Sequence, residues 1–177
     1  NLLEQINSSN SSAIICSNNV FTKISEFSSI KIPILQFDKI TENTDSPIVE
    51  LKTNEIASLI YTSGTTSVPK GVGITHSMVE FTTKNITHVL KYTQSDIDVL
   101  PLPLFHSFGL GCLHTSLFNG STLVLLKNAN DLQKILDTIK KYNATTLAAI
   151  PATLSKFLQF NEKYLMDSFS GIRLIIT

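Results

Sequence analysis

The chain has 177 residues, of which 42% are hydrophobic and 16% charged, so it carries enough apolar side chain to build a packed core. Lysine plus arginine and aspartate plus glutamate number 14 each, and the formal net charge is zero. This balance, with Arg173 as the only arginine, argues against a nucleic-acid partner, which would favour a basic surface. No apolar run approaches the roughly 20 residues of a membrane span.

The expected elements alternate between strand and helix. The amino-terminal segment predicts a short helix on Leu2, Leu3 and Ile6, and a polar loop is expected over 41–54. Apolar runs predict strands at 13–16, 32–35, 56–61, 99–104, 122–126, 145–150 and 172–176. Helices are expected over 77–92, 108–119 and 131–142, with a short one after Pro151. The later runs are continuously apolar, which is typical of strands covered on both faces. The sequence therefore predicts a layered α/β fold with a largely parallel sheet and flanking helices.

Two cysteines, Cys16 and Cys112, lie far apart, and neither they nor the four histidines have metal-ligand spacing. We expect free thiols and a cytoplasmic protein, because disulfides form in oxidising compartments.

The stretch YTSGTTSVPKGV, residues 61–72, follows the expected strand at 56–61 directly. Small residues let backbone N–H groups converge on a phosphate, and rotatable hydroxyls add donors. Lys70 supplies a cation for the outer phosphates. The stretch is not a Walker A loop, because Pro69 precedes the lysine and Gly71 follows it. We expect a phosphate-binding loop at the carboxyl end of a parallel strand, where α/β sheets bind ligands.

Residues 61–72 resemble the signature loop of the adenylate-forming (AMP-binding, acyl-CoA synthetase-like) superfamily, with Ser67 where that family usually has glycine. A second stretch, LPLFHSFG at 102–109, resembles the family segment P-L-F-H-x-x-G. The resemblance implies that the phosphates of ATP are held by Thr62, Ser63, Gly64, Thr65, Thr66 and Lys70. It also implies that Phe105, His106 and Gly109 border the substrate pocket.

The resemblance implies a two-step reaction on a small-molecule carboxylic acid. ATP with Mg²⁺ first gives an acyl adenylate, and coenzyme A then takes the acyl group, as in fatty acid metabolism. Lys70 would act electrostatically, because the substrate carboxylate is itself the nucleophile. Two alternatives stay open: an adenylation domain of the nonribosomal peptide synthetase type, and a non-catalytic nucleotide-binding or interaction module.

The resemblance is good over residues 56–177 and loose over residues 1–55. We therefore expect the chain to be a fragment of one AMP-binding domain, with a truncated nucleotide-loop subdomain at 56–177. Such a fragment is expected to be inactive alone. Its apolar faces would favour pairing with a second copy, which makes a homo-oligomer an expectation.

Overall fold

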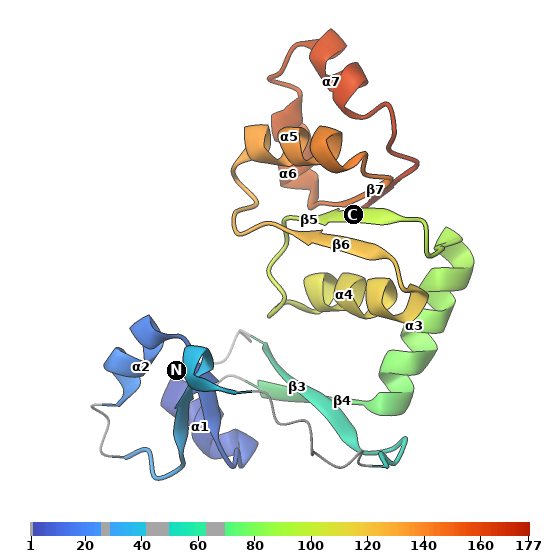
Figure 1. The fold of residues 1–177 in the computed structure, drawn as a ribbon. Helices are drawn as coiled ribbons and strands as arrows, with labels where there is room; N and C mark the ends of the chain where they lie inside the picture. The colour runs from blue at the N-terminus through green and yellow to red at the C-terminus, as the bar shows by residue number, and fades with distance from the viewer. Residues whose placement is uncertain (1, 26–28, 42–49, 63–69) are drawn as a thin grey trace. The chain divides into compact units, whose positions relative to one another are not determined.

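The computed structural model describes residues 2–25, 29–41, 50–62 and 70–177 (Figure 1). The chain divides into two compact units, residues 1–76 and 77–177, and each is described by itself.

The first unit contains two small sheets. Its elements are α1 (Leu2–Ser9), β1 (Ile14–Cys16), α2 (Asn18–Ile24), β2 (Ile34–Gln36), the 3-10 turn η1 (Phe37–Lys39), β3 (Ile56–Thr62) and β4 (Lys70–Thr75). Strands β1 and β2 pair in parallel, whereas β3 and β4 pair antiparallel. The expected helix near Leu2 and the strands near 13–16, 32–35 and 56–61 are confirmed within a few residues.

The expectation that a parallel strand precedes the predicted phosphate-binding loop, here called the hydroxyl-rich loop (residues 62–70), is wrong. Strand β3 pairs antiparallel with β4, which directly follows the loop in sequence. Strand β4 was not predicted, because Gly71 and Gly73 weaken its apolar pattern and glycine is depleted in strands. At Gly71, a residue of the neighbouring strand β3 explains why a glycine is needed. A Cβ at Gly71 would lie 3.1 Å from Leu59 Cδ1, so a side chain there would press on β3.

The second unit is a four-stranded parallel sheet with helices on both faces. Its elements are α3 (His76–Leu90), β5 (Ile97–Leu100), α4 (Ser107–Asn119), β6 (Thr122–Leu125), α5 (Leu132–Tyr142), β7 (Thr146–Ala148), α6 (Pro151–Phe157), α7 (Glu162–Ser168) and β8 (Leu174–Ile176). The strand order is β6-β5-β7-β8, and every pairing is parallel. The predicted α/β fold with a largely parallel sheet is therefore confirmed.

Two apolar clusters cover the two faces of this sheet. The larger includes Val99 and Leu147 from the strands and the buried face of α5, with Ile135 and Leu136 fully buried. The smaller joins Leu100 to the α4 side. Figure 1 shows α5 and α4 on opposite sides of the sheet, in agreement with the two clusters. Both faces of the sheet are therefore covered by helices, as the continuous apolar runs in its strands predicted.

Local signals set several helix ends as expected. Asp131 caps α5 by accepting a 3.1 Å hydrogen bond from the backbone N–H of Lys134. Gly120 ends α4 in the left-handed region, with φ of 65°. The expected strand 99–104 is wrong at its end, because β5 stops at Leu100, before Pro101. Helix α7 was not predicted at all.

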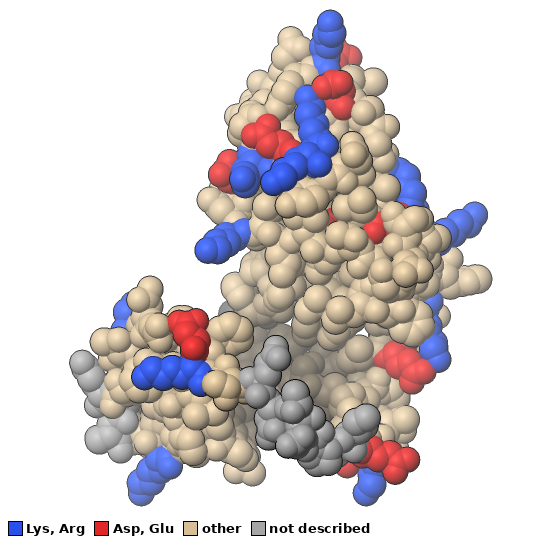
Figure 2. Space-filling view, viewed as in Figure 1, with Lys and Arg blue, Asp and Glu red and all other residues tan. Residues whose placement is uncertain are grey.

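The charged side chains of the second unit are mixed in sign. Figure 2 shows blue and red atoms side by side over α5 and α7. One such pair is Lys140 Nζ and Asp167 Oδ2, 2.6 Å apart, in which the aspartate is exposed and the lysine is half-buried over the Tyr164 ring. Among the described helices, none combines the length and the apolar character that crossing a membrane requires.

Candidate active site

The ends of the hydroxyl-rich loop are two paired strand residues. Thr62 is the last residue of β3 and Lys70 the first of β4, and they are register partners. Thr62 Oγ1 donates a hydrogen bond of 3.4 Å to the Lys70 carbonyl oxygen. Antiparallel partners lie roughly 5 Å apart at their Cα atoms, so the intervening segment leaves and re-enters the ladder at neighbouring points. The predicted phosphate ligands Ser63, Gly64, Thr65 and Thr66 lie outside the described residues.

The ammonium group of Lys70 is available to a ligand. Its residue is exposed, and none of the ion pairs within the described part of the chain involves it. A lysine carries three N–H donors and a full positive charge. An anion that approaches the end of the β3–β4 pair can therefore bind it without breaking an ion pair of the described residues.

The neighbouring residue Tyr61 fixes the base of the loop to α1. Its hydroxyl donates a hydrogen bond of 3.1 Å to the Gln5 carbonyl oxygen and lies 2.7 Å from Ser8 Oγ. Two groups of α1 therefore hold the Tyr61 side chain, one residue before β3 ends at Thr62.

The second predicted motif leads from β5 into α4. His106 is the N-cap residue of α4, with extended backbone, and its N–H donates to the Pro103 carbonyl oxygen at 3.3 Å. Phe105 is 75% exposed, and its ring centroid lies 4.5 Å from that of His106, which is also exposed. Both predicted pocket residues therefore present aromatic surface outward.

Gly109 is buried and has a backbone role. A Cβ at this position would lie 2.4 Å from the Pro103 carbonyl oxygen, closer than real atoms approach. Only glycine lets the first turn of α4 sit against the turn that follows β5. The structure brings Phe105, His106 and Gly109 together in the second unit, whereas Thr62 and Lys70 belong to the first.

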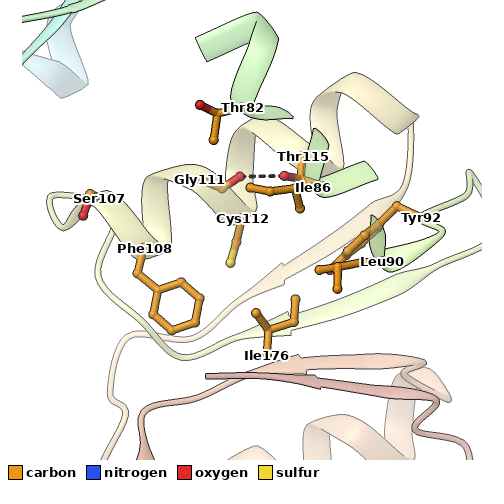
Figure 3. Close-up of a pocket in the computed structure, with 10 residues that line it drawn as sticks. All are labelled: Thr82, Ile86, Leu90, Tyr92, Ser107, Phe108, Gly111, Cys112, Thr115 and Ile176. Carbon is orange, nitrogen blue, oxygen red and sulfur yellow. Dashed lines mark hydrogen bonds between the residues drawn. The ribbon is translucent and has the colours of Figure 1, made fainter. Parts of the chain in front are cut away.

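A cavity of about 200 Å³ lies along the same helix, entirely within the second unit (Figure 3). Helix α4, helix α3 and the strand β8 supply most of its walls. Its ten lining residues are Thr82, Ile86, Leu90, Tyr92, Ser107, Phe108, Gly111, Cys112, Thr115 and Ile176. None of them is charged, and their exposed atoms are almost entirely apolar. The cavity begins beside His106, at the adjacent residues Ser107 and Phe108.

Polar groups in the cavity wall are satisfied or neutral. Thr115 Oγ1 donates to the Gly111 carbonyl oxygen at 2.9 Å, as Figure 3 shows. Burial raises the pKa of the Cys112 thiol to about 11, so this sulfur is protonated at neutral pH and behaves as a small apolar group. Burial, and then the hydrogen bond to Asp98, raise the pKa of Tyr92 well above its usual range. The Tyr92 hydroxyl is therefore a permanent donor.

Behind the cavity a buried carboxylate joins four segments. Asp98, 5% exposed, accepts hydrogen bonds from Tyr92 Oη at 2.7 Å, Ser116 Oγ at 2.7 Å, Ser121 Oγ at 3.1 Å and Thr146 Oγ1. A carboxylate has four lone-pair sites, so the four hydroxyls satisfy it. The network holds Tyr92 in the cavity wall and fixes α4 through Ser116.

A second buried carboxylate secures the end of α3. Asp96, 3% exposed, accepts hydrogen bonds from Arg173 Nε at 2.8 Å and from Arg173 Nη2 at 2.7 Å. Arg173 also donates to the carbonyl oxygens of Leu90 and Lys91 at 3.1 and 3.2 Å. The guanidinium holds the pKa of Asp96 well below its usual range. The only arginine in the sequence thus connects the residue before β8 to the carboxyl end of α3.

Sequence reasoning missed both carboxylates. The alternation in SDIDVL places Asp96 and Asp98 two residues apart at the start of an apolar run, which is a signal that they share a face. The partners that satisfy them lie up to 77 residues away in sequence, and nothing local identifies them. Within the described part of the chain, no group of three or more histidine, cysteine or acidic residues is placed to hold a metal ion.

Comparison with known proteins identifies the family. The family model described as AMP-binding enzyme matches residues 2–177. An oxalate–CoA ligase of Arabidopsis thaliana is 36% identical over 121 residues, which are 67% of this chain and 24% of that protein. A 2-succinylbenzoate–CoA ligase of Bacillus subtilis is 35% identical over 103 residues, 58% of this chain and 21% of that protein.

A solved structure gives the same result. The O-succinylbenzoate coenzyme A synthetase of Bacillus subtilis, in complex with AMP, superimposes with a TM-score of 0.81 at 27% identity. The superposition covers 98% of this chain and 44% of the other. The chain therefore spans about a quarter of the length of the curated relatives and under half of that structure. Because the family model matches nearly the whole chain and the fold agrees, this chain belongs to the AMP-binding enzyme family.

Proposed function

We propose that the protein carrying this chain is an acid–thiol ligase, which activates a small carboxylic acid with ATP and transfers the acyl group to coenzyme A. The observation that carries the proposal is the exposed Lys70, paired with Thr62 at the ends of the loop motif in a chain of the AMP-binding family. The relatives named above are CoA ligases, which supports coenzyme A as the acceptor rather than a carrier-protein thiol.

In the first step a carboxylate oxygen attacks the α-phosphorus of ATP, and the bond to the bridging oxygen of pyrophosphate breaks. In the second step the thiolate of coenzyme A attacks the acyl carbon, and AMP leaves with the former carboxylate oxygen. Neither step needs a nucleophile from this chain. Its contribution is to position the triphosphate and to balance negative charge as pyrophosphate departs.

The proposed phosphate ligands are the hydroxyls and N–H groups of Thr62, Ser63, Gly64, Thr65 and Thr66 together with the Lys70 ammonium. The short spacing between Thr62 and Lys70 supports this role, because a loop closed at its base can surround a phosphate. Mg²⁺ would be brought by the triphosphate. Since the described residues offer no acidic cluster, no step is assigned to a metal held by this chain.

The acid is proposed to lie beside α4. Phe105 and His106 present their rings at the start of that helix, next to the Ser107–Phe108 end of the cavity. Gly109 would serve the site indirectly, by holding the helix start against Pro103. We further propose that residues 1–177 are part of one AMP-binding domain and do not catalyse the reaction alone, since the matched residues make up only 24% and 21% of the two named relatives.

The test is ATP–pyrophosphate exchange in the full-length protein, driven by a panel of carboxylic acids. We expect acid-dependent exchange, and we expect Lys70→Ala to lower it roughly 10- to 100-fold, because a hydrogen bond to a charged group contributes about 1.5–3 kcal/mol. The matched control is Lys52→Ala, which removes an exposed lysine of the same unit that is assigned no role.

Both variants should keep the thermal midpoint of the wild type, because exposed lysines contribute little to stability. Two results would count against the proposal: well-folded protein that shows no exchange with any acid of the panel, or equal effects of Lys70→Ala and Lys52→Ala on exchange.

A further inference from the structure

Tyr61 connects the end of β3 to a helix that lies more than 50 residues earlier in the chain. It is the last residue but one of β3, and its register partner on β4 is Gly71. Its hydroxyl donates to the Gln5 carbonyl oxygen of α1 at 3.1 Å and lies 2.7 Å from Ser8 Oγ. A tyrosine hydroxyl has one proton, so the Ser8 hydroxyl is the donor in the shorter contact. One side chain thus joins α1 to the strand that enters the hydroxyl-rich loop.

The Tyr61 ring lies close against the backbone of β4. A Cβ on Gly71 would be 3.3 Å from Tyr61 Cζ, which is tighter than ordinary van der Waals contact. A side chain at position 71 would therefore push the ring away from the strand. Helix α1 itself contacts β4. The glycine lets the tyrosine lie flat against β4 while its hydroxyl reaches the helix.

The side chains that would meet a phosphate lie on the opposite face of the β3–β4 pair. Successive residues of a strand point to opposite faces, and register partners of an antiparallel pair share a face. Tyr61 and Gly71 therefore occupy the face that meets α1, and Thr62 and Lys70 occupy the other. Both of the latter residues are exposed. The contact with α1 thus supports the end of the strand pair from behind and leaves its front face open to a ligand.

We propose that Tyr61 is a positioning residue for ATP, which holds the paired Thr62 and Lys70 in place for the phosphates through its two hydrogen bonds to α1. The inference rests on the proposed function and adds a residue that acts through its neighbours. Without this anchor, ATP would have to order the end of the strand pair as it binds, and such ordering weakens binding. The anchor supports bound ATP and the transition state alike. Its loss should therefore raise KM for ATP and leave kcat nearly unchanged.

The experiment measures acid-dependent pyrophosphate exchange in the full-length protein, with ATP and the acid varied in turn. Tyr61→Phe keeps the ring and removes the hydroxyl. The net contribution of a typical hydrogen bond corresponds to about a 2- to 13-fold change in an equilibrium constant, so we expect KM for ATP to rise about 3- to 10-fold. Because uniform binding is lost, kcat should change by less than about twofold, and KM for the acid should stay the same.

Two neighbouring serines of α1 separate positioning from stability. Ser8→Ala removes one partner of the Tyr61 hydroxyl, so it should raise KM for ATP by less than Tyr61→Phe does. The double variant should match Tyr61→Phe alone, because Ser8 acts on β3 through that hydroxyl. Ser9→Ala is the matched control, since Ser9 Oγ bonds the Ile6 carbonyl oxygen and Ser11 Oγ, both outside β3. It should leave KM for ATP unchanged.

Three results would overturn the inference. They are a KM for ATP in Tyr61→Phe equal to that of the wild type, a loss in kcat at constant KM, or an equal rise in KM for Ser9→Ala. If Tyr61→Phe does not fold, the comparison of Ser8→Ala with Ser9→Ala decides the question.

A binding measurement distinguishes this inference from the proposed function. Calorimetry gives the Kd of MgATP for the wild type and for Tyr61→Phe with no acid present. If no acid drives exchange but Tyr61→Phe weakens MgATP binding by the expected factor, the ligase proposal fails and the positioning role stands. If exchange occurs but both forms bind MgATP equally, the positioning role fails and the ligase proposal stands. Wild-type protein that binds no MgATP would overturn both.

Discussion

The ion pair between Asp96 and Arg173 offers a test of how the second unit is held together. Substituting Arg173→Met keeps an unbranched aliphatic stem but removes the guanidinium. Asp96 then loses two hydrogen bonds, and the carbonyl oxygens of Leu90 and Lys91 lose one each. The carboxylate itself stays buried, at 3% exposure.

Removing one partner of a fully buried ion pair costs about 3–5 kcal/mol. The cost should be smaller for this pair, since the Arg173 side chain is 38% exposed and water can reach the vacated space. Asp96 also keeps hydrogen bonds from the Thr93 N–H and the Thr145 hydroxyl, both at 2.8 Å. We therefore expect the free energy of unfolding to fall by about 2 kcal/mol at pH 7.

The loss should depend on pH in a defined direction. Hydrogen bonding from Arg173 is the main cause that lowers the pKa of Asp96 in the folded state from its ordinary value of 3.8. A lowered folded-state pKa contributes stability that is fully present above pH 3.8 and is lost as the pH falls through the folded-state value. The difference in the free energy of unfolding between wild type and Arg173→Met should therefore be constant near neutral pH and become smaller below about pH 4.

The assay is urea unfolding of the 177-residue chain, followed by far-ultraviolet circular dichroism at pH 7 and at pH 3. Lys140→Met is the control. It breaks the ion pair with Asp167, a solvent-accessible carboxylate, and should lower the free energy of unfolding far less than Arg173→Met does. Equal losses in the two variants at pH 7, or a loss for Arg173→Met that is the same at pH 3, would refute this reasoning.

Two further predictions concern α4. Gly109→Ala should lower the free energy of unfolding by about 1–3 kcal/mol in urea titrations, because its Cβ would lie 2.4 Å from the Pro103 carbonyl oxygen; stability equal to wild type would show that the turn does not need the close approach. Cys112 should react slowly with iodoacetamide, because a pKa raised from 9.0 to about 11 lowers the thiolate fraction about 100-fold at pH 8. Mass spectrometry of labelled peptides measures that rate, and labelling as fast as an ordinary thiol would contradict the burial of this sulfur.

The layered α/β architecture could be predicted from the sequence because its signals are local. Continuous apolar runs marked the strands of the parallel sheet, and the five apolar positions of 132–142 marked α5. Asp131 and Gly120 marked helix ends whose geometry depends on one residue each. The family resemblance rested on two contiguous motifs, which need no tertiary information to recognise.

The remainder depends on contacts between distant residues. Strand β4 carries two glycines, and its pairing with β3 becomes evident only from the register of Thr62 with Lys70. The partners of Asp98 reach it from as far as Thr146, 48 positions along the chain. The cavity arises where α3, α4 and β8 meet. No local pattern encodes such a meeting, so the sequence alone could not predict the cavity.

The most direct test of the central claim is isotope transfer from the acid to AMP. The full-length protein is supplied with the carboxylic acid that best drives pyrophosphate exchange, labelled with ¹⁸O in both carboxylate oxygens, together with ATP, Mg²⁺ and coenzyme A, and the AMP product is analysed by mass spectrometry. Our account predicts one ¹⁸O atom in the phosphate of each AMP, because the carboxylate attacks the α-phosphorus and its oxygen leaves with AMP. Acyl-CoA formed together with unlabelled AMP would contradict the account.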